Sequence, residues 1–368
     1  MNQDTFIIEI KIKKVRHLED FSISLGKEKK HLILTGKNGS GKTSVLENIH
    51  QKFIHLYKNN TAESFLNIVF NDRDFRDKTK EDFIYAYLID KRRDKKMLEP
   101  KGAKKLELSK DKLEKLNDNF LQYLVNLKID LLFAKVENET ENIQALEKWF
   151  CDFENMMKQI FDDSFKITLD RTDYTFWIER DNREPFTFNT LSAGYWAIID
   201  IVSEIIMKIS TTTSKSFDCH GIVLIDELET HLHVELQKDI FPMLTRFFPN
   251  IQFIVTTHSP FVLSSLENSV IYDLERKEQV SGERLYIASY KDIVKNYFEV
   301  DNEASQILED MLSKYENLTN LFVDNILSIE NERELVNLEL KLDEVASMMT
   351  ENNYLRFKEA QDRISEDD

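Results

Sequence analysis

The spacing of hydrophobic residues divides the first 53 positions into three short segments and one longer one. FIIEIKIKKV (residues 6–15) and DFSISL (20–25) alternate between apolar and polar positions, which predicts two half-buried strands. HLILT (31–35) is an almost unbroken apolar run and predicts a buried strand. After it, Val45, Ile49 and Phe53 recur at helical spacing. The pattern therefore predicts a strand and a helix on either side of residues 36–43.

Strand-like and helical segments continue along the chain. Two runs, 64–70 and 82–89, are expected to form an antiparallel part of the fold. Residues 108–161 carry apolar side chains three or four positions apart, which predicts helices, and 165–170 with 174–180 predict a hairpin. The apolar runs 222–225 and 251–257 predict parallel strands buried on both faces. Segments 268–274 and 283–288 are expected to complete a mixed sheet.

The turn at residues 36–43 reads GKNGSGKT and matches the phosphate-binding pattern G-x-x-x-x-G-K-[ST]. Glycines allow backbone conformations closed to other residues, so successive N–H groups can surround a polyphosphate at the positive end of the helix. Lys42 would place a charge against the outer phosphates, and Thr43 a hydroxyl ligand for Mg²⁺. The alternative, a chance glycine-rich turn, does not explain the strand and helix that flank it. The candidate ATP-binding residues are Gly36, Lys37, Asn38, Gly39, Ser40, Gly41, Lys42 and Thr43.

Two carboxylates, Asp226 and Glu227, directly follow the apolar run IVLI. A parallel strand would deliver both to its carboxyl end, beside the phosphate loop. Asp226 is expected to hold Mg²⁺ through water, and Glu227 to polarise the attacking water. Two ordinary surface acids at a strand end are the alternative, which the neighbouring phosphate loop disfavours.

The segment LSAGY (191–195) resembles the signature of ABC-type ATPases, LSGGQ. In ABC dimers this element closes over the γ-phosphate bound by the other subunit, which makes Ser192 and Gly194 candidate ATP contacts. Ala193 in place of glycine is a mild departure, whereas Tyr195 in place of glutamine removes a polar contact. His258 stands where the ABC family has a histidine that senses the γ-phosphate, and a purely structural histidine is the alternative.

Together these motifs resemble the RecF/SMC group of ABC-type ATPases over residues 5–275. In that group the segment around Arg16 lies beside the nucleotide base, although an ordinary surface arginine is an equally good interpretation. DELETHLH (226–233) resembles RecF and overcoming-lysogenization ATPases more than transporters. The glutamine loop expected of the family contains no glutamine here, and Asn71 or Asp72 is the candidate substitute.

Charge is distributed unevenly along this chain of 368 residues, whose net charge is −17. Residues 301–368 contain 18 acidic and 6 basic residues. They also carry an apolar stripe, which needs a packing surface, so this region is expected to carry protein contacts. Residues 91–105, in contrast, hold 8 basic and 2 acidic residues, and form either a solvated loop or a mobile loop that contacts nucleic acid or a partner. The C-terminal stripe predicts a helical hairpin or small bundle, and its members are Leu335, Leu338, Leu342, Val345 and Met349.

The resemblance implies an α/β fold: a P-loop ABC-type ATPase lobe with a mixed β-sheet, an antiparallel β subdomain, an inserted helical subdomain and C-terminal helices. Residues 1–90 would form the N-terminal half of the lobe, 91–163 the basic run and helical subdomain, 164–290 the C-terminal half, and 291–368 the acidic helical region. The longest apolar run, 195–207, is interrupted by Asp200 and Glu204, and no secretory signal is visible. We therefore expect a cytoplasmic protein without a membrane span.

The resemblance also implies a Mg²⁺-dependent ATPase, with ATP and Mg²⁺ as cofactors, that acts as a head-to-tail homodimer or higher homo-oligomer. The chain is most similar to the compact ATPases of bacterial anti-phage systems, in particular the Septu ATPases, which are paired with a separate HNH nuclease. Regulation of a separately encoded effector, a nuclease, is therefore the favoured function, with nucleic acid as a further candidate partner.

Three other functions fit the sequence less well. An ATPase of DNA repair or recombination, of the RecF/SMC type, is the main alternative. A transporter motor would need a glutamine loop and a membrane partner. A self-contained nuclease would need a TOPRIM domain, for which only 110 residues follow His258.

Overall fold

The computed structural model describes residues 5–58, 65–72, 83–89, 96–109, 111–213, 215–288, 293, 306–324 and 326–365. It divides into two compact units, Met1–Tyr290 and Lys291–Asp368, which are described separately below. At the start of the predicted acidic helical region, residues 291–305 lie outside the described residues except for Ile293.

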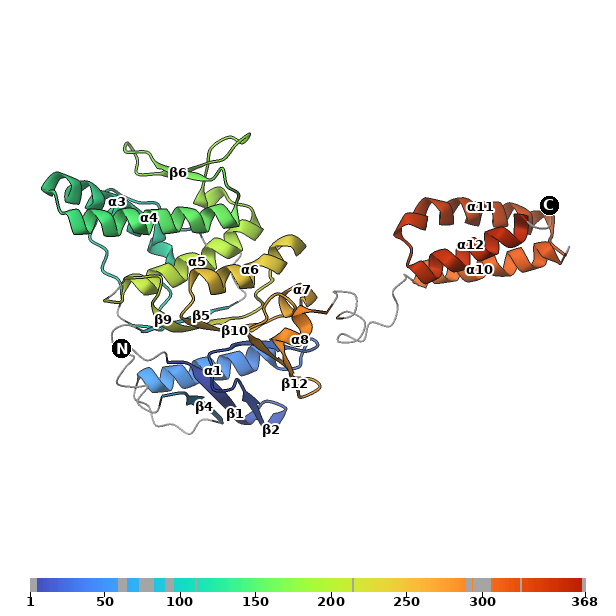
Figure 1. Ribbon diagram of the computed structural model, residues 1–368, viewed down its shortest axis with the longest axis horizontal. Coiled ribbons are helices and arrows are strands. Elements are labelled where there is room, and N and C mark those ends of the chain that lie inside the picture. The colour runs from blue at the N-terminus through green and yellow to red at the C-terminus, as the bar shows by residue number, and fades with distance from the viewer. Residues whose placement is uncertain are drawn as a thin grey trace. The chain divides into compact units, whose positions relative to one another are not determined.

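A six-stranded mixed sheet forms the centre of the first unit (Figure 1). Its strand order is β12-β11-β3-β10-β9-β5, and the five strands other than β12 are parallel to one another. This confirms the predicted α/β fold with a mixed sheet. The strands are β3 (His31–Thr35), β5 (Phe83–Leu88), β9 (His220–Ile225), β10 (Ile251–Thr256), β11 (Ser269–Asp273) and β12 (Glu278–Ser281).

A second sheet is antiparallel and has the order β2-β1-β4. It consists of β1 (Ile7–Val15), β2 (Leu18–Ser24) and β4 (Leu66–Phe70). Helix α1 (Lys42–Tyr57) lies between the two sheets, and its Val45, Ile49 and Phe53 are fully buried in the core that both sheets share (Figure 1). The helix predicted after the phosphate loop is thus confirmed, and apolar packing on both sides fixes it.

Two sequence-based assignments of strands are wrong in part. β5 was expected in the antiparallel sheet, but it pairs in parallel with β9, because its residues are apolar on both faces and nearly all buried. Residues 283–288 were expected to be a strand, but Gly282–Tyr286 form the short helix α8. A strand would place Leu285 and Ile287 on the same face, whereas they are 7% and 82% exposed.

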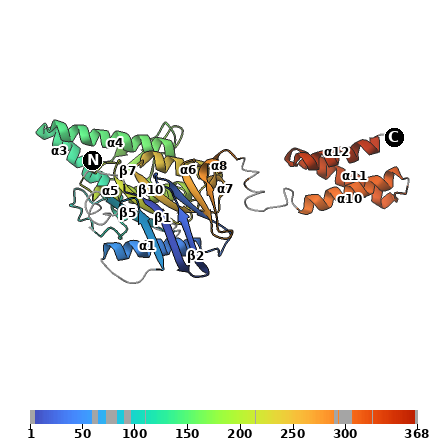
Figure 2. The ribbon, with the colours of Figure 1, turned by 60° about the horizontal axis from the view of Figure 1, so that its bottom comes forward.

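Helices cover the face of the central sheet opposite α1 (Figure 1). They are α5 (Ala193–Ser210) and α6 (Val234–Phe247), followed after β10 by the single turn α7 (Pro260–Leu263). The helical subdomain adds α3 (Phe120–Glu137) and α4 (Thr140–Ile160), which lie side by side in both views (Figures 1 and 2). The predicted hairpin forms a three-stranded sheet of β6 (Lys166–Leu169), β7 (Phe176–Glu179) and β8 (Phe186–Thr187), and 3₁₀ turns η1 (Asn117–Asn119) and η2 (Phe188–Thr190) precede α3 and α5.

The second unit is a bundle of three helices with its own core. They are α10 (Gln306–Val323), α11 (Ile329–Val345) and α12 (Glu351–Ser365), with a 3₁₀ turn η4 (Ala346–Met348) after α11. The predicted apolar stripe forms part of that core, because Leu335 and Leu342 are buried and Leu338 packs against them. Between helices, Arg356 binds Glu309 at 2.8 Å and Glu316 at 2.9 Å.

We predict that Leu342→Ala destabilises the second unit alone. Leu342 is fully buried, so the substitution leaves a cavity and should lower the free energy of unfolding of α10–α12 by about 2–5 kcal/mol. Leu340→Ala, at a position 62% exposed on the same helix, is the matched control and should change it by less than about 0.5 kcal/mol. Hydrogen exchange, measured on the full chain, reports the amide protection of both units in one experiment. Equal protection in the two variants, or a loss that extends to β3 and α1, would contradict separate cores.

Candidate functional site

Three parallel strands end at one edge of the central sheet, and each is followed by candidate site residues. β3 leads into the phosphate loop, β9 into Asp226 and Glu227, and β10 into His258. The strands are paired so that Thr256 lies beside Leu34 and Val255 beside Ile225. Ends of parallel strands are the usual position of a ligand site in open α/β sheets.

The phosphate loop depends on glycine at three positions. Gly36, Gly39 and Gly41 have φ angles of +135°, +84° and +99°, in the left-handed region that favours glycine. At Gly36 a Cβ would also lie only 2.8 Å from Ser40 Oγ. The hydroxyl of Ser40 is buried without a hydrogen-bond partner in the described part of the chain. A tight loop with an unused polar atom, placed directly before the first turn of α1, fits a polyphosphate ligand.

Lys42 places a buried cation in this loop. Its Nζ donates to the carbonyl oxygens of Gly36 at 2.9 Å and Lys37 at 3.1 Å. Burial lowers the pKa of Lys42, and four carboxylates at the strand ends oppose that shift. The ammonium therefore lies where it can neutralise phosphate oxygens. The four carboxylates belong to Glu227, Glu229, Asp226 and Asp273.

The structure brings the two candidate Mg²⁺ ligands together. Thr43 Oγ1 donates to Asp226 Oδ1 at 3.2 Å, and Thr256 Oγ1 donates to the same oxygen at 2.6 Å. Asp226 is only 4% exposed, so both hydrogen bonds compensate a buried carboxylate. A hydroxyl beside a carboxylate is an oxygen donor set that Mg²⁺ prefers.

Glu227 has an unusual backbone conformation for a residue with a side chain. Its φ is +47°, and its N–H donates to Thr256 Oγ1 at 2.7 Å. Its Oε2 accepts a hydrogen bond of 3.1 Å from Thr230 Oγ1. A left-handed non-glycine residue costs free energy and occurs most often where function requires it. The turn holds Glu227 half-buried, immediately after Asp226.

His258 follows β10, and a hydrogen bond of its backbone joins it to the turn after β9. Its backbone N–H donates to Glu229 Oε1 at 2.5 Å, while Glu229 Oε2 is buried without a partner among the described residues. Burial and then Lys42 lower the pKa of His258, and nearby carboxylates only partly offset this. The imidazole is therefore neutral at pH 7. Ser259 accepts from the N–H groups of Phe261 and Val262 and so caps α7.

Three residues of this site were not predicted: Glu229, Thr256 and Asp273. Thr256 and Asp273 are the last residues of β10 and β11, the two neighbours of β3. Asp273 Oδ1 would lie 3.4 Å from a Cβ at Gly36, so it borders the phosphate loop. Position in the sequence could have indicated Thr256 and Asp273, because a polar residue that ends an apolar strand beside β3 has to lie at this edge of the sheet.

Ser192 and Gly194 lie at the start of α5, on a different element from the phosphate loop. Among the described residues neither one is hydrogen-bonded to residues 36–43. Gly194 instead packs against the turn after β9, where a Cβ would lie 3.1 Å from the carbonyl oxygen of His231. The structure therefore presents two separate groups of anion-binding candidates within one chain.

Two further expectations concern the surroundings of the loop. Arg16 is exposed in the β1–β2 turn, next to His17 and Leu18, which border Gly41. Asn71 accepts a hydrogen bond of 2.9 Å from the N–H of Phe6, so it is tied to the edge of the antiparallel sheet. The strand beside Asp226 is β5, since Asp226 N donates to Leu88 O at 2.8 Å, and residues 90–95 after it lie outside the described residues.

The described part of the basic run, residues 96–105, is hydrogen-bonded to α3. The carboxamide of Gln122 on α3 binds Lys101 N at 3.1 Å and Gly102 O at 2.7 Å. Asn126 Nδ2 binds Lys104 O at 2.8 Å, and the side chain of Met97 is buried. Side-chain amides thus hold the backbone of this stretch along α3. Contact with nucleic acid stays a prediction.

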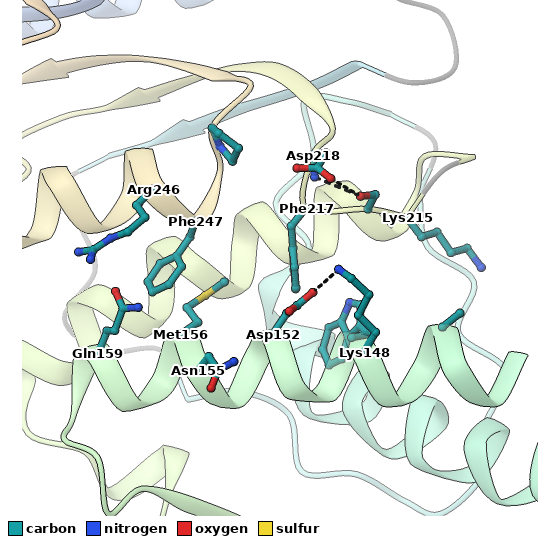
Figure 3. Close-up of a pocket in the computed structure, with 14 residues that line it drawn as sticks. Lys148, Asp152, Asn155, Met156, Gln159, Lys215, Phe217, Asp218, Arg246 and Phe247 are labelled. Carbon is teal, nitrogen blue, oxygen red and sulfur yellow. Dashed lines mark hydrogen bonds and ion pairs between the residues drawn. The ribbon is translucent and has the colours of Figure 1, made fainter. Parts of the chain in front are cut away.

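A hollow of about 510 Å³ lies between α4, the loop 215–218 and the end of α6 (Figure 3). Its charged groups have both signs, and Lys148 pairs with Asp152 at 2.7 Å. Arg246 and Lys215 lie at different sides of it (Figure 3). None of the candidate site residues lines this hollow.

Among curated proteins, the Septu protein PtuA of Bacillus mycoides (strain KBAB4) is 27% identical over 76% of this chain and 42% of its own length. The Retron Ec83 probable ATPase of Escherichia coli is 37% identical over 35% of this chain and 24% of its own length. The chain thus spans less than half the length of these two relatives. A solved structure, the SMC head bound to the C-winged helix domain of ScpA, is 12% identical, with a TM-score of 0.44, over 76% of this chain and 99% of that chain.

One family matches more than half of the chain, over residues 48–264. The match begins within α1, just after the phosphate loop, and contains Ser192, Asp226, Glu227 and His258. The chain belongs to this family, which is described as AAA domain, putative AbiEii toxin, Type IV TA system.

Proposed function

We propose that this protein is an ATPase that binds ATP with Mg²⁺ at the carboxyl ends of β3, β9 and β10. The observation that carries the proposal is the 3.2 Å hydrogen bond between Thr43 and Asp226, beside the buried ammonium of Lys42. A hydroxyl of the phosphate loop, a strand-end carboxylate and a cation meet there, which is the arrangement that phosphoryl transfer requires.

Each side chain has one role in this proposal. The N–H groups of residues 36–43 and the ammonium of Lys42 hold the phosphates, and Thr43 with Asp226 would hold Mg²⁺. The metal would supply charge neutralisation of the β- and γ-phosphates. Glu227 orients and polarises the attacking water, and the strained turn at φ +47° fixes the direction of its side chain. The neutral His258 would contact the γ-phosphate with one ring N–H.

A second copy of the chain would complete this site. Ser192 and Gly194 do not reach the phosphate loop within one chain, although they stand at the start of an 18-residue helix, where N–H groups favour an anion. A head-to-tail homodimer, alone or within a larger homo-oligomer, would bring α5 of one copy over the loop of the other. Glu227 and Ser192 would then face the same nucleotide from two chains.

We further propose that ATP binding controls a separately encoded effector, a nuclease such as an HNH protein, in anti-phage defence. The support is similarity to a Septu protein and to a retron ATPase, together with a second unit that has a core of its own. An ATPase of DNA repair or recombination is the alternative. Within the described residues, no helix is long and apolar enough to cross a membrane.

Gly36→Ala should weaken binding of Mg²⁺-ATP at least about tenfold. The added methyl group would lie 2.8 Å from Ser40 Oγ at a φ of +135°, so the loop must change shape. Gly26→Ala is the matched control, because Gly26 has a φ of +89° and no atom within 4 Å of an added Cβ. Titration with a fluorescent ATP analogue measures both. A folded Gly36→Ala variant with the affinity of Gly26→Ala would contradict the proposed ATP site.

Glu227→Gln should bind ATP with an affinity close to that of the wild type but hydrolyse it at least about 100-fold more slowly, because the amide cannot accept a proton from water. Dimers should accumulate in the presence of ATP, as measured by light scattering. Glu278→Gln, on the edge strand β12, is the control and should behave as the wild type. Equal turnover in the wild type and in Glu227→Gln would rule out the role of Glu227.

Deletion of residues 301–368 should leave a folded protein that binds ATP but forms smaller assemblies with itself or with the effector. The first unit keeps its own core, whereas the deleted helices carry exposed apolar side chains on α11. Leu340→Ser removes one of these side chains, 62% exposed, and Lys341→Ser is its control. Full assembly of the deletion variant, measured by mass photometry after co-expression, would refute the interaction role.

A further inference from the structure

Helix α5 buries three ionisable side chains. Asp200, Glu204 and Lys208 follow one another at four-residue spacing, so they form one row along the helix. They are 1%, 3% and 3% exposed. Burial of charged groups costs free energy unless they are paired and hydrogen-bonded, so this row requires a dedicated partner.

The partner of the first two acids is the segment that leads into α3. Lys115 Nζ donates to Asp200 Oδ1 at 3.0 Å, and Asn117 Nδ2 donates to the same oxygen at 2.6 Å. The backbone N–H groups of Leu116 and Asn117 both donate to Glu204 Oε2, at 2.8 and 2.9 Å. Two backbone donors and two side-chain donors therefore converge on α5 from a single stretch of chain.

Lys208 extends this contact towards the central sheet. Its Nζ donates to the carbonyl oxygen of Lys112 at 2.9 Å and to that of Glu114. Lys112 Nζ in turn donates to Phe83 O at 2.7 Å, and Phe83 is the first residue of β5. Phe83 pairs with His220 at the start of β9, and Asp226 follows the other end of that strand. Residues 112–117 thus join α5 to the strand beside the candidate Mg²⁺ site.

A second set of hydrogen bonds holds the same part of the chain against a residue that precedes α5. Asn189 Oδ1 accepts from Met97 N at 2.9 Å, and Asn189 Nδ2 donates to Met97 O at 3.1 Å. Asn189 lies three residues before Ser192, and the side chain of Met97 is 3% exposed. We call residues 97–109 and 111–117 the connecting segment. It is held at Met97 beside the start of α5, and at residues 112–117 along the helix itself.

We propose that Asn189, Asp200 and Glu204 are positioning residues for ATP hydrolysis, which act through the connecting segment. The segment fixes the start of α5, with Ser192 and Gly194, relative to the β5–β9 edge that carries Asp226. The inference rests on the proposed function, since the start of α5 would meet ATP only when two copies close. Rigid placement matters because two anion sites must match one polyphosphate at hydrogen-bond distances.

The test uses the full-length protein and Asn189→Ala, which removes both bonds to Met97 and leaves the buried row intact. Asn189 Nδ2 also donates to Glu99 Oε1, so the variant loses three hydrogen bonds at a positioning contact, and kcat should fall about tenfold. The Kd of a fluorescent ATP analogue, which reports the phosphate loop, should stay within about twofold of the wild type. ATP-dependent dimerisation in a Glu227→Gln background should also weaken. Asp152→Asn, on α4, is the control and should leave all three unchanged, because its partner Lys148 is 77% exposed.

A merely structural role predicts a different result. In that case kcat and ATP affinity would fall together with the unfolding temperature, and this outcome overturns the inference. Wild-type kcat in a folded Asn189→Ala variant also overturns it. Should Asn189→Ala fail to fold, Lys115→Met replaces it, because Lys115 is 37% exposed and its loss removes the ion pair to Asp200. A wild type without ATP turnover refutes the proposed function itself, whereas an active wild type with unchanged variants refutes only this inference.

Discussion

A buried carboxylate at the end of β9 determines how the strand ends of the first unit are arranged. Asp226 cannot stay in the interior without hydrogen bonds, and it receives them from Thr43 at the start of α1 and from Thr256 at the end of β10. Loss of either donor would remove one of these hydrogen bonds and lower the free energy of unfolding by about 1–3 kcal/mol. One oxygen atom thus ties together the phosphate loop, the carboxylate strand and the strand that leads to His258.

The loop is held in place by apolar packing some distance from it. Val45, Ile49 and Phe53 are fully buried between the central sheet and the antiparallel sheet, and they fix the axis of α1. Lys42 and Thr43 occupy the first turn of that helix, so their positions follow from contacts one to three turns further along. The loop can therefore adopt its left-handed glycine conformations while Lys42 and Thr43 stay in place.

Much of this arrangement could be predicted from the sequence, because the loop, β3, β9 and β10 are short motifs with strong local patterns. The strand at 283–288 was predicted wrongly, since a run of six residues does not distinguish a strand from a single helical turn. β5 was assigned to the wrong sheet because an apolar run shows burial on both faces but not its neighbours. Asp200 and Glu204 were interpreted only as interruptions of an apolar run, since their donors come from residues more than 80 positions away.

The separate core of the second unit has a consequence for how such a protein can change over time. Its buried side chains contact one another, so substitutions there are constrained only by the bundle itself. Its outward-facing residues include Val336 and Leu340, which would contact a partner under the proposed interaction role. Under that proposed role, substitutions on the surface of the roughly sixty residues of α10–α12 could change the partner during evolution. The strand ends and the glycine turn would stay unchanged.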